Sequence, residues 1–243
     1  MTRIRYALGA CTFALLLWQG IVWLTGVPSF ILPSPLRVAQ AALDNRVLIA
    51  ENALVTATEV ILGLITGTVL GAFTAVQFAN SDRLHRLVMP LLIFTQAVPV
   101  FALAPILTLW FGYGIASKVV MAVLIIYFPV TSAFYDGLTR VPADILDMAK
   151  IMGGTKRQIM RRIKIPHALP SLGTGLKLAA VYAPIGAVIG EWVGASKGLG
   201  YLMLLANGRA KTDLMFASLF TLVVMTLLLS LAVTKASDHL SKP

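Results

Sequence analysis

Long apolar stretches alternate with short polar intervals along almost the whole chain. A helix needs about 20 mainly apolar residues to cross a bilayer, and six stretches approach or reach that length. They cover residues 7–24, 56–79, 87–110, 118–134, 172–193 and 214–234. The pattern predicts an all-α, polytopic membrane protein with six transmembrane helices. It forms a single transmembrane domain over residues 1–243, with a core at about 50–235.

The first apolar stretch has two competing interpretations. Residues 7–24 follow Arg3 and Arg5, as the apolar part of a secretory signal peptide would. However, the stretch is longer than a usual signal core, and no clear small-residue cleavage site follows it in residues 25–28. We therefore expect a retained first span. After it, Ser34-Pro35 has the form of a helix start and predicts a short amphipathic helix.

Three glycines and one acidic residue distinguish the second stretch, residues 56–79. Gly63, Gly67 and Gly71 lie four residues apart, so they share one helical face and allow another helix to approach closely. Glu59 lies near the predicted outer end. An acidic residue in a span is a candidate for a transport role, but at an interface it can also be simply solvated.

Prolines interrupt the third stretch, residues 87–110, at Pro90, Pro99 and Pro105. Each removes a backbone donor, and broken helices are tolerated at membrane depth only where they face protein or a water-filled cavity. Gln96 and Pro99 are therefore candidates to line a substrate path, although a kinked structural helix is an equal alternative. Glu191, at the outer end of residues 172–193, is a further candidate.

The longest polar interval, residues 140–170, carries seven basic residues against two acidic ones. Within it, apolar positions recur at i, i+3, i+4 and i+7 from Ile145 to Met152 and predict an amphipathic helix. Gly153-Gly154 should end that helix. Thr155 and Gln158 have the spacing of a capping box, which predicts a second short helix before the fifth span.

Composition and charge placement support a membrane protein. The chain is 58% hydrophobic and 12% charged, with a mean hydropathy of +0.85. The net charge of +10 does not suggest nucleic-acid binding, because the basic residues flank apolar runs. Six spans leave fourteen of the twenty basic residues on one side. The positive-inside rule makes that side cytoplasmic, together with both termini and residues 140–170.

Motifs for bound metals, cofactors or catalysis are not recognisable. Gly153-Gly154-Thr155-Lys156 lacks the spacing of a phosphate-binding loop, so any ATP hydrolysis must occur in another chain. The single cysteine, Cys11, excludes an internal disulfide and a cysteine-based metal site. Paired carboxylates or a Ser/His array near one interface are also missing from the sequence, so we do not expect an enzyme.

A spacing pattern in the polar interval resembles a known family. Asp147-Met148-Ala149 is followed after three residues by Gly153, and after nine more by Ile163-Lys164-Ile165-Pro166. This is similar to the EAA loop of ABC importer permeases, in which Glu-Ala-Ala, Gly and Ile-x-Leu-Pro have the same spacing. Asp147 and Met148 depart from the family's Glu and Ala. The resemblance implies an ATPase-coupling role for Asp147, Met148, Ala149, Lys150, Gly153, Gly154, Ile163 and Pro166.

The resemblance extends to other parts of the chain. The Ile-Leu-Pro-Ser-Pro segment at 31–35 and Gly198-Leu199-Gly200 are similar to the nitrate, sulfonate and taurine branch of these permeases. Residues 190–204 look most like permeases for pyrimidine-type thiamine precursors, while riboflavin, sulfonate, taurine or nitrate uptake stays open. The resemblance implies a bacterial inner membrane, ABC ATPase subunits that use ATP-Mg, an extracytoplasmic binding protein and a second permease copy. An ion-coupled secondary transporter is the alternative from another class.

Overall fold

The computed structural model describes residues 2–240, except for the side chains of residues 2–5, 7, 8, 11 and 240. Cys11, Arg3, Arg5 and Lys242 therefore lie outside the described side chains. The helical elements are α1 (Thr2–Thr25), α2 (Pro35–Asp44), α3 (Arg46–Asn80), α4 (Asp82–Ala97), α5 (Val100–Phe111), α6 (Ile115–Thr139), α7 (Ala143–Ile151), α8 (Lys156–Ile159), the π-helical turn η1 (Met160–Lys164), α9 (Ile165–Gly194), α10 (Leu199–Gly208) and α11 (Thr212–Leu240).

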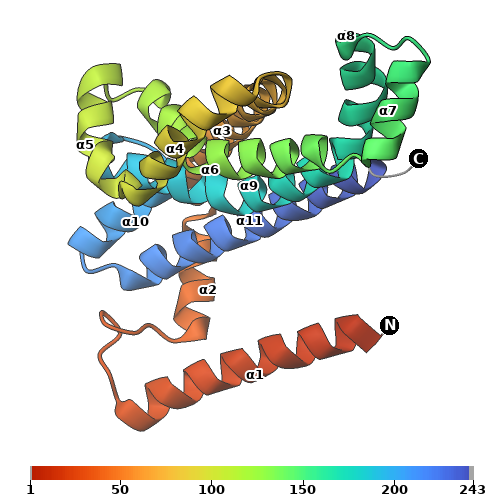
Figure 1. Cartoon of the computed structure of the whole chain (residues 1–243). Helices are drawn as coiled ribbons and strands as arrows, with labels where there is room; N and C mark the ends of the chain where they lie inside the picture. The colour runs from red at the N-terminus through yellow and green to blue at the C-terminus, as the bar shows by residue number, and fades with distance from the viewer. Residues whose placement is uncertain (1, 241–243) are drawn as a thin grey trace.

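Helices α3, α6 and α9 form the centre of the bundle, and α11 lies along α9 (Figure 1). The glycine row of α3 faces α6, as the sequence predicts. A Cβ atom on Gly63 would lie 2.6 Å from the Cβ of Ala122, and one on Gly67 would lie 2.7 Å from the Ile126 side chain. Glycine at these positions therefore allows the close approach of the α3 and α6 backbones.

Among the described residues, four helices are long and apolar enough to cross a membrane: Arg46–Asn80, Ile115–Thr139, Lys156–Gly194 and Thr212–His239. A fifth candidate is the pair α4 and α5, which meet at an angle of 101°. The break that the prolines of residues 87–110 predict is therefore present, and the alternative of a single kinked helix is wrong. Pro99 forces the preceding Val98 into an extended conformation (φ −83°, ψ 119°), which ends α4.

The predicted boundary before the fifth span is also wrong. Residues 156–194 form one continuous helical segment through α8, η1 and α9, instead of a separate short helix followed by a span. In the wide turn η1, the Ile165 N–H donates to the Met160 carbonyl five residues back. This turn accommodates the ring and the missing donor of Pro166, so the proline does not end the helix.

The N-terminal helices are attached at few points. Helix α2 begins at Pro35, and the Ser34 hydroxyl accepts a hydrogen bond from the Arg37 N–H, which confirms the predicted start. In Figure 1, α1 runs apart from the bundle and is joined to it through α2. Trp18 of α1 contacts the rings of Phe216 and Phe220 on α11. The apolar part with described side chains, Thr12–Thr25, is shorter than the four long spans, so a membrane-spanning α1 stays a prediction.

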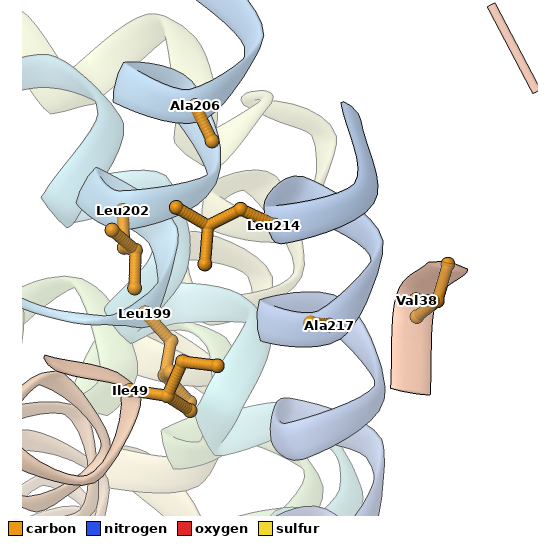
Figure 2. Packing of buried hydrophobic residues seen from close by; sticks show 7 residues of the cluster. All are labelled: Val38, Ile49, Leu199, Leu202, Ala206, Leu214 and Ala217. Atoms are coloured by element: carbon orange, nitrogen blue, oxygen red, sulfur yellow. The ribbon is translucent and has the colours of Figure 1, made fainter. Parts of the chain in front are cut away.

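A short helix, α10, begins at Leu199. Its apolar face contributes three side chains to a buried cluster that also includes residues of α2, α3 and α11 (Figure 2). The members are Val38, Ile49, Leu199, Leu202, Ala206, Leu214 and Ala217. This packing fixes α10 at the end of the bundle opposite α7, and it places the first turn of α10 beside α3 and α9 (Figure 1).

Candidate functional site

Helix α7 and the turn after it lie at one end of the bundle (Figure 1). Pro142 precedes the helix and Asp144 lies in its first turn. The helix ends in a Schellman motif: the Gly153 N–H donates to the Lys150 carbonyl, and the Gly154 N–H donates to the Ala149 carbonyl, both at 2.9 Å. Gly153 has φ +81°, a conformation that favours glycine.

The residues after this turn continue directly into α9. Thr155 and Gln158 form the predicted capping box, with the Gln158 Oε1 accepting from the Thr155 N–H at 2.8 Å. Ile163 lies in the π-helical turn, and Pro166 lies in the first turn of α9. The residues that resemble the EAA pattern therefore run from α7 to the base of a long apolar helix.

One face of α7 is exposed and apolar. Met148 and Met152 are 63% and 80% exposed, and Ile145 is also exposed. None of the side chains of α7, all of which the structure describes, is buried. Asp147 forms an exposed ion pair with Lys150, with 2.7 Å between Oδ1 and Nζ. An apolar helical face outside the long apolar helices suits a groove in a partner protein.

The other face of α7 lies over a cleft of about 470 Å³ between α7 and the ends of α3 and α4. Leu146 and Lys150 line it from α7, with Lys156 and Lys164 from the following segment. Since residues 146 and 150 are four apart, they share a helical face distinct from that of Met148 and Met152. Helix α7 thus faces its own protein on one side and is free on the other.

The break between α4 and α5 exposes polar groups among apolar side chains. Gln96 and Pro99 are both exposed, and the Gln96 amide donates to the Thr95 hydroxyl at 3.5 Å. No side chain of α4, a fully described helix, is buried in this chain. Irregular backbone at membrane depth requires protein or water around it. This break therefore needs something besides lipid to cover it.

The two candidate acidic residues lie together in the protein interior at the α10 end. Glu59 is 3% exposed and Glu191 is 1% exposed. The interpretation of Glu59 as a solvated interfacial residue is therefore wrong, because α3 begins at Arg46 and buries this position. The Glu191 carboxylate accepts from the Thr56 hydroxyl at 2.6 Å and from the Gly200 N–H. One Glu59 carboxylate oxygen has no hydrogen-bond partner among the described residues.

Three further polar residues of this cluster were missed by sequence reasoning. Asn52 and Thr56 precede Glu59 at i, i+4 and i+7 spacing, a polar stripe on the glycine face of α3 that could have indicated them. Lys118, counted from the sequence as an outer surface charge, is 1% exposed. Its ammonium group donates to the Tyr113 and Gly194 carbonyls at 2.7 Å. Tyr113 is five residues away in the chain, but the second partner, Gly194, is 76 residues away and is brought to Lys118 by the fold.

The described residues include no group of three His, Cys, Asp or Glu side chains that could hold a metal ion. The fold instead defines a helical membrane protein of a known architecture. It matches a chain of the methionine ABC transporter MetNI, solved in inward-facing conformations, with a TM-score of 0.71 and 20% identity. The match covers 82% of this chain and 99% of that one.

The sequence profile described as "Binding-protein-dependent transport system inner membrane component" matches residues 67–242, more than half of the chain. The protein belongs to this family of binding-protein-dependent ABC transporter permeases. It is a multi-pass inner-membrane permease component and not itself an ATPase. Membership in the family implies an ATPase and a binding protein as partners.

Three relatives are similar over most of their length. A probable ABC transporter permease of Haemophilus influenzae is 47% identical over 88% of both chains. The formylaminopyrimidine transport permease ThiX of Halalkalibacterium halodurans is 37% identical, over 99% of this chain and 97% of its own. The riboflavin transport permease RibX of Chloroflexus aurantiacus is 36% identical, over 88% of this chain and 81% of its own.

Proposed function

We propose that the chain, paired with a second copy, forms the substrate path of an ATP-driven importer and that α7 couples this path to the ATPase. The observation that carries the proposal is the exposed apolar face of α7, held by a rigid turn at the base of α9. Asp147, Met148, Ala149 and Lys150 contribute the docking helix. Gly153 and Gly154 form its turn, while Ile163 and Pro166 join it to α9.

The proposed topology has six spans within a single membrane domain. Helix α1 is the first span, and the α4–α5 pair is the third, although it is broken. Both termini and α7 are cytoplasmic. The excess of basic residues on that side supports this orientation, as does the position of the start of α1 and the end of α11 on the α7 side of the molecule (Figure 1).

The second copy is proposed to cover the α4–α5 break, so that Gln96 and Pro99 line the path between the two chains. The exposed polar groups at the break support this arrangement, because lipid cannot satisfy them. A homodimer is the simplest arrangement, since symmetric pairing of one chain doubles the number of spans. Glu59 and Glu191 stay candidates for the path at its outer end, although both are buried in this conformation.

An ion-coupled secondary transporter is the alternative class. In the sequence, Glu59 and Glu191 are the acidic residues of the predicted spans, and both lie near span ends instead of forming a mid-span pair, which argues against ion coupling. The structure brings Glu59 and Glu191 together, so that argument no longer holds. The case against ion coupling rests on membership in a binding-protein-dependent family.

The proposed substrate is a pyrimidine precursor of thiamine. Similarity to the formylaminopyrimidine permease over nearly the whole chain supports it. Riboflavin is the second candidate, because the riboflavin permease is almost equally similar. Sulfonate, taurine and nitrate are further alternatives.

Competition for uptake separates these substrates. Cells that express the permease with its ATPase and binding protein are given labelled formylaminopyrimidine. Uptake should fall when unlabelled hydroxymethylpyrimidine is added in excess and should not change with excess riboflavin or taurine. Uptake of labelled riboflavin, with no uptake of the pyrimidine, would reject the pyrimidine assignment in favour of the second candidate.

A further inference from the structure

The first turn of α10 is capped by side chains of other helices. The first N–H groups of a helix have no partner inside it, and the glycine that precedes α10 has no side chain to supply one. The Gly198 N–H donates to the Asn52 Oδ1 and the Leu199 N–H donates to the Thr56 Oγ1, both at 2.8 Å. The Gly200 N–H donates to the Glu191 carboxylate. Three consecutive donors of α10 thus bind α3 and α9.

The acceptors are also bound to one another. The Thr56 hydroxyl accepts from Leu199 and donates to Glu191, so it links all three helices through one oxygen atom. Thr56 is fully buried. Each of these bonds therefore lies out of water, where an unpaired polar group is costly.

The two glycines of Gly198-Leu199-Gly200 are required by this contact. Gly198 has φ +117°, and a Cβ atom there would overlap the Glu191 carboxylate. A Cβ atom on Gly200 would lie 2.7 Å from the Glu191 Oε2. The backbone of α10 can approach the carboxylate only where side chains are missing.

Glu191 lies near the far end of the continuous segment Lys156–Gly194, which starts directly after the α7 turn. A helix of 39 residues at about 1.5 Å per residue extends on the order of 50 Å. One continuous helical segment therefore reaches from the proposed ATPase-coupling loop to the cap of α10.

We propose that Asn52, Thr56 and Glu191 are positioning residues that fix α10 to α9 and α3, so that a displacement of α9 at the α7 end also moves α10. This inference rests on the proposed coupling role of α7. The hydrogen-bonded cap is the contact through which ATP-driven movement reaches the outer loop of the transporter.

Thr56→Val and Thr56→Ser test the proposal as a matched pair. Valine has the shape of threonine without the hydroxyl, so it leaves the Leu199 N–H and the Glu191 Oε1 without their partner. Serine keeps the hydroxyl. Both variants are purified as full-length permease in complex with the ATPase and reconstituted in lipid vesicles with the binding protein.

Thr56→Val should assemble with the ATPase and keep its basal ATP hydrolysis. Its uptake, and the stimulation of its ATP hydrolysis by the binding protein, should fall at least tenfold. Thr56→Ser should stay within about twofold of the unaltered protein. Equal uptake by the two variants would overturn the proposal. If Thr56→Val lost assembly, basal hydrolysis and uptake together, the cap would be only a structural contact. That result would also overturn the proposal.

Hydrogen exchange separates this proposal from the proposed function. The amides of Leu199 and Gly200 should exchange at least tenfold faster in Thr56→Val than in Thr56→Ser, whether or not the vesicles transport anything. If the unaltered protein transports none of the tested substrates, the proposed function fails. The difference in amide exchange rate between Thr56→Val and Thr56→Ser should still be observed. Unchanged exchange in Thr56→Val would contradict the cap itself.

Discussion

Gly153→Val perturbs the turn after α7 without touching anything else. Gly153 has φ +81°, and no described atom lies within 4 Å of the position that a Cβ would occupy. A clash is therefore not expected. The cost is conformational, because a residue with a side chain loses about 1–2 kcal/mol in the left-handed region, and a β-branched residue loses more.

The chain can avoid this cost only by rearranging the turn. It would then lose the bonds from Gly153 to Lys150 and from Gly154 to Ala149, each with a net contribution of about 0.5–1.5 kcal/mol. Either way, the native orientation of α7 relative to α9 is destabilised by about 2 kcal/mol. If the ATPase binds only this orientation, its affinity falls about thirtyfold.

Pull-down of the ATPase with tagged permease, followed by ATP-driven uptake in vesicles, measures this effect. Gly153→Val should reach the membrane in normal amounts but bind the ATPase weakly and transport poorly. Gly153→Asn is the matched control, because asparagine tolerates the left-handed conformation, and it should retain most activity. Normal ATPase binding and transport by Gly153→Val would refute the coupling assignment of this loop.

Three other substitutions give distinct results. Gly63→Val should lower the melting temperature of the purified permease, because its Cβ would lie 2.6 Å from that of Ala122. The control, Thr66→Val at an exposed position on the same helix, should leave the melting temperature unchanged. Equal melting temperatures of the two variants would contradict the close α3–α6 contact. Lys118→Met should also lower the melting temperature, because the partly buried carbonyls of Tyr113 and Gly194 lose their donor, with a net loss of about 0.5–1.5 kcal/mol for each hydrogen bond. An unaltered melting curve would contradict a stabilising role of Lys118. Met148→Glu should abolish co-purification of the ATPase while Met148→Leu retains it, and retention by both would show that the exposed face of α7 does not dock.

Local signals in the sequence predicted the local parts of the fold. Ser34-Pro35 marked the start of α2, Gly153-Gly154 marked the end of α7, and Thr155 marked a cap, because each depends on backbone donors within a few residues. The glycine row from Gly63 predicted a close helix contact for a similar reason. The small size of these glycines and their four-residue spacing can both be read from one short segment of the sequence.

The errors occurred where distant or subtle backbone features decide the structure. A second short helix was expected to end before the fifth span at 172–193, but a π-helical turn of five residues lets the helix continue past Pro166. Glu59 was assigned to a wet interface because the true start of α3 at Arg46 is polar. The bond from Lys118 to Gly194 and the bonds from the start of α10 to Asn52 and Thr56 join residues more than 70 positions apart in the chain, which no local pattern reveals.

ATP-driven uptake by the reconstituted complex tests the central claim most directly. Vesicles hold the permease and its ATPase, with the binding protein and labelled formylaminopyrimidine on the opposite side of the membrane from the ATPase. Accumulation should require ATP-Mg on the ATPase side and the binding protein on the other, and it should be insensitive to proton and sodium ionophores. Accumulation without ATP that collapses when an ion gradient is abolished would contradict the account.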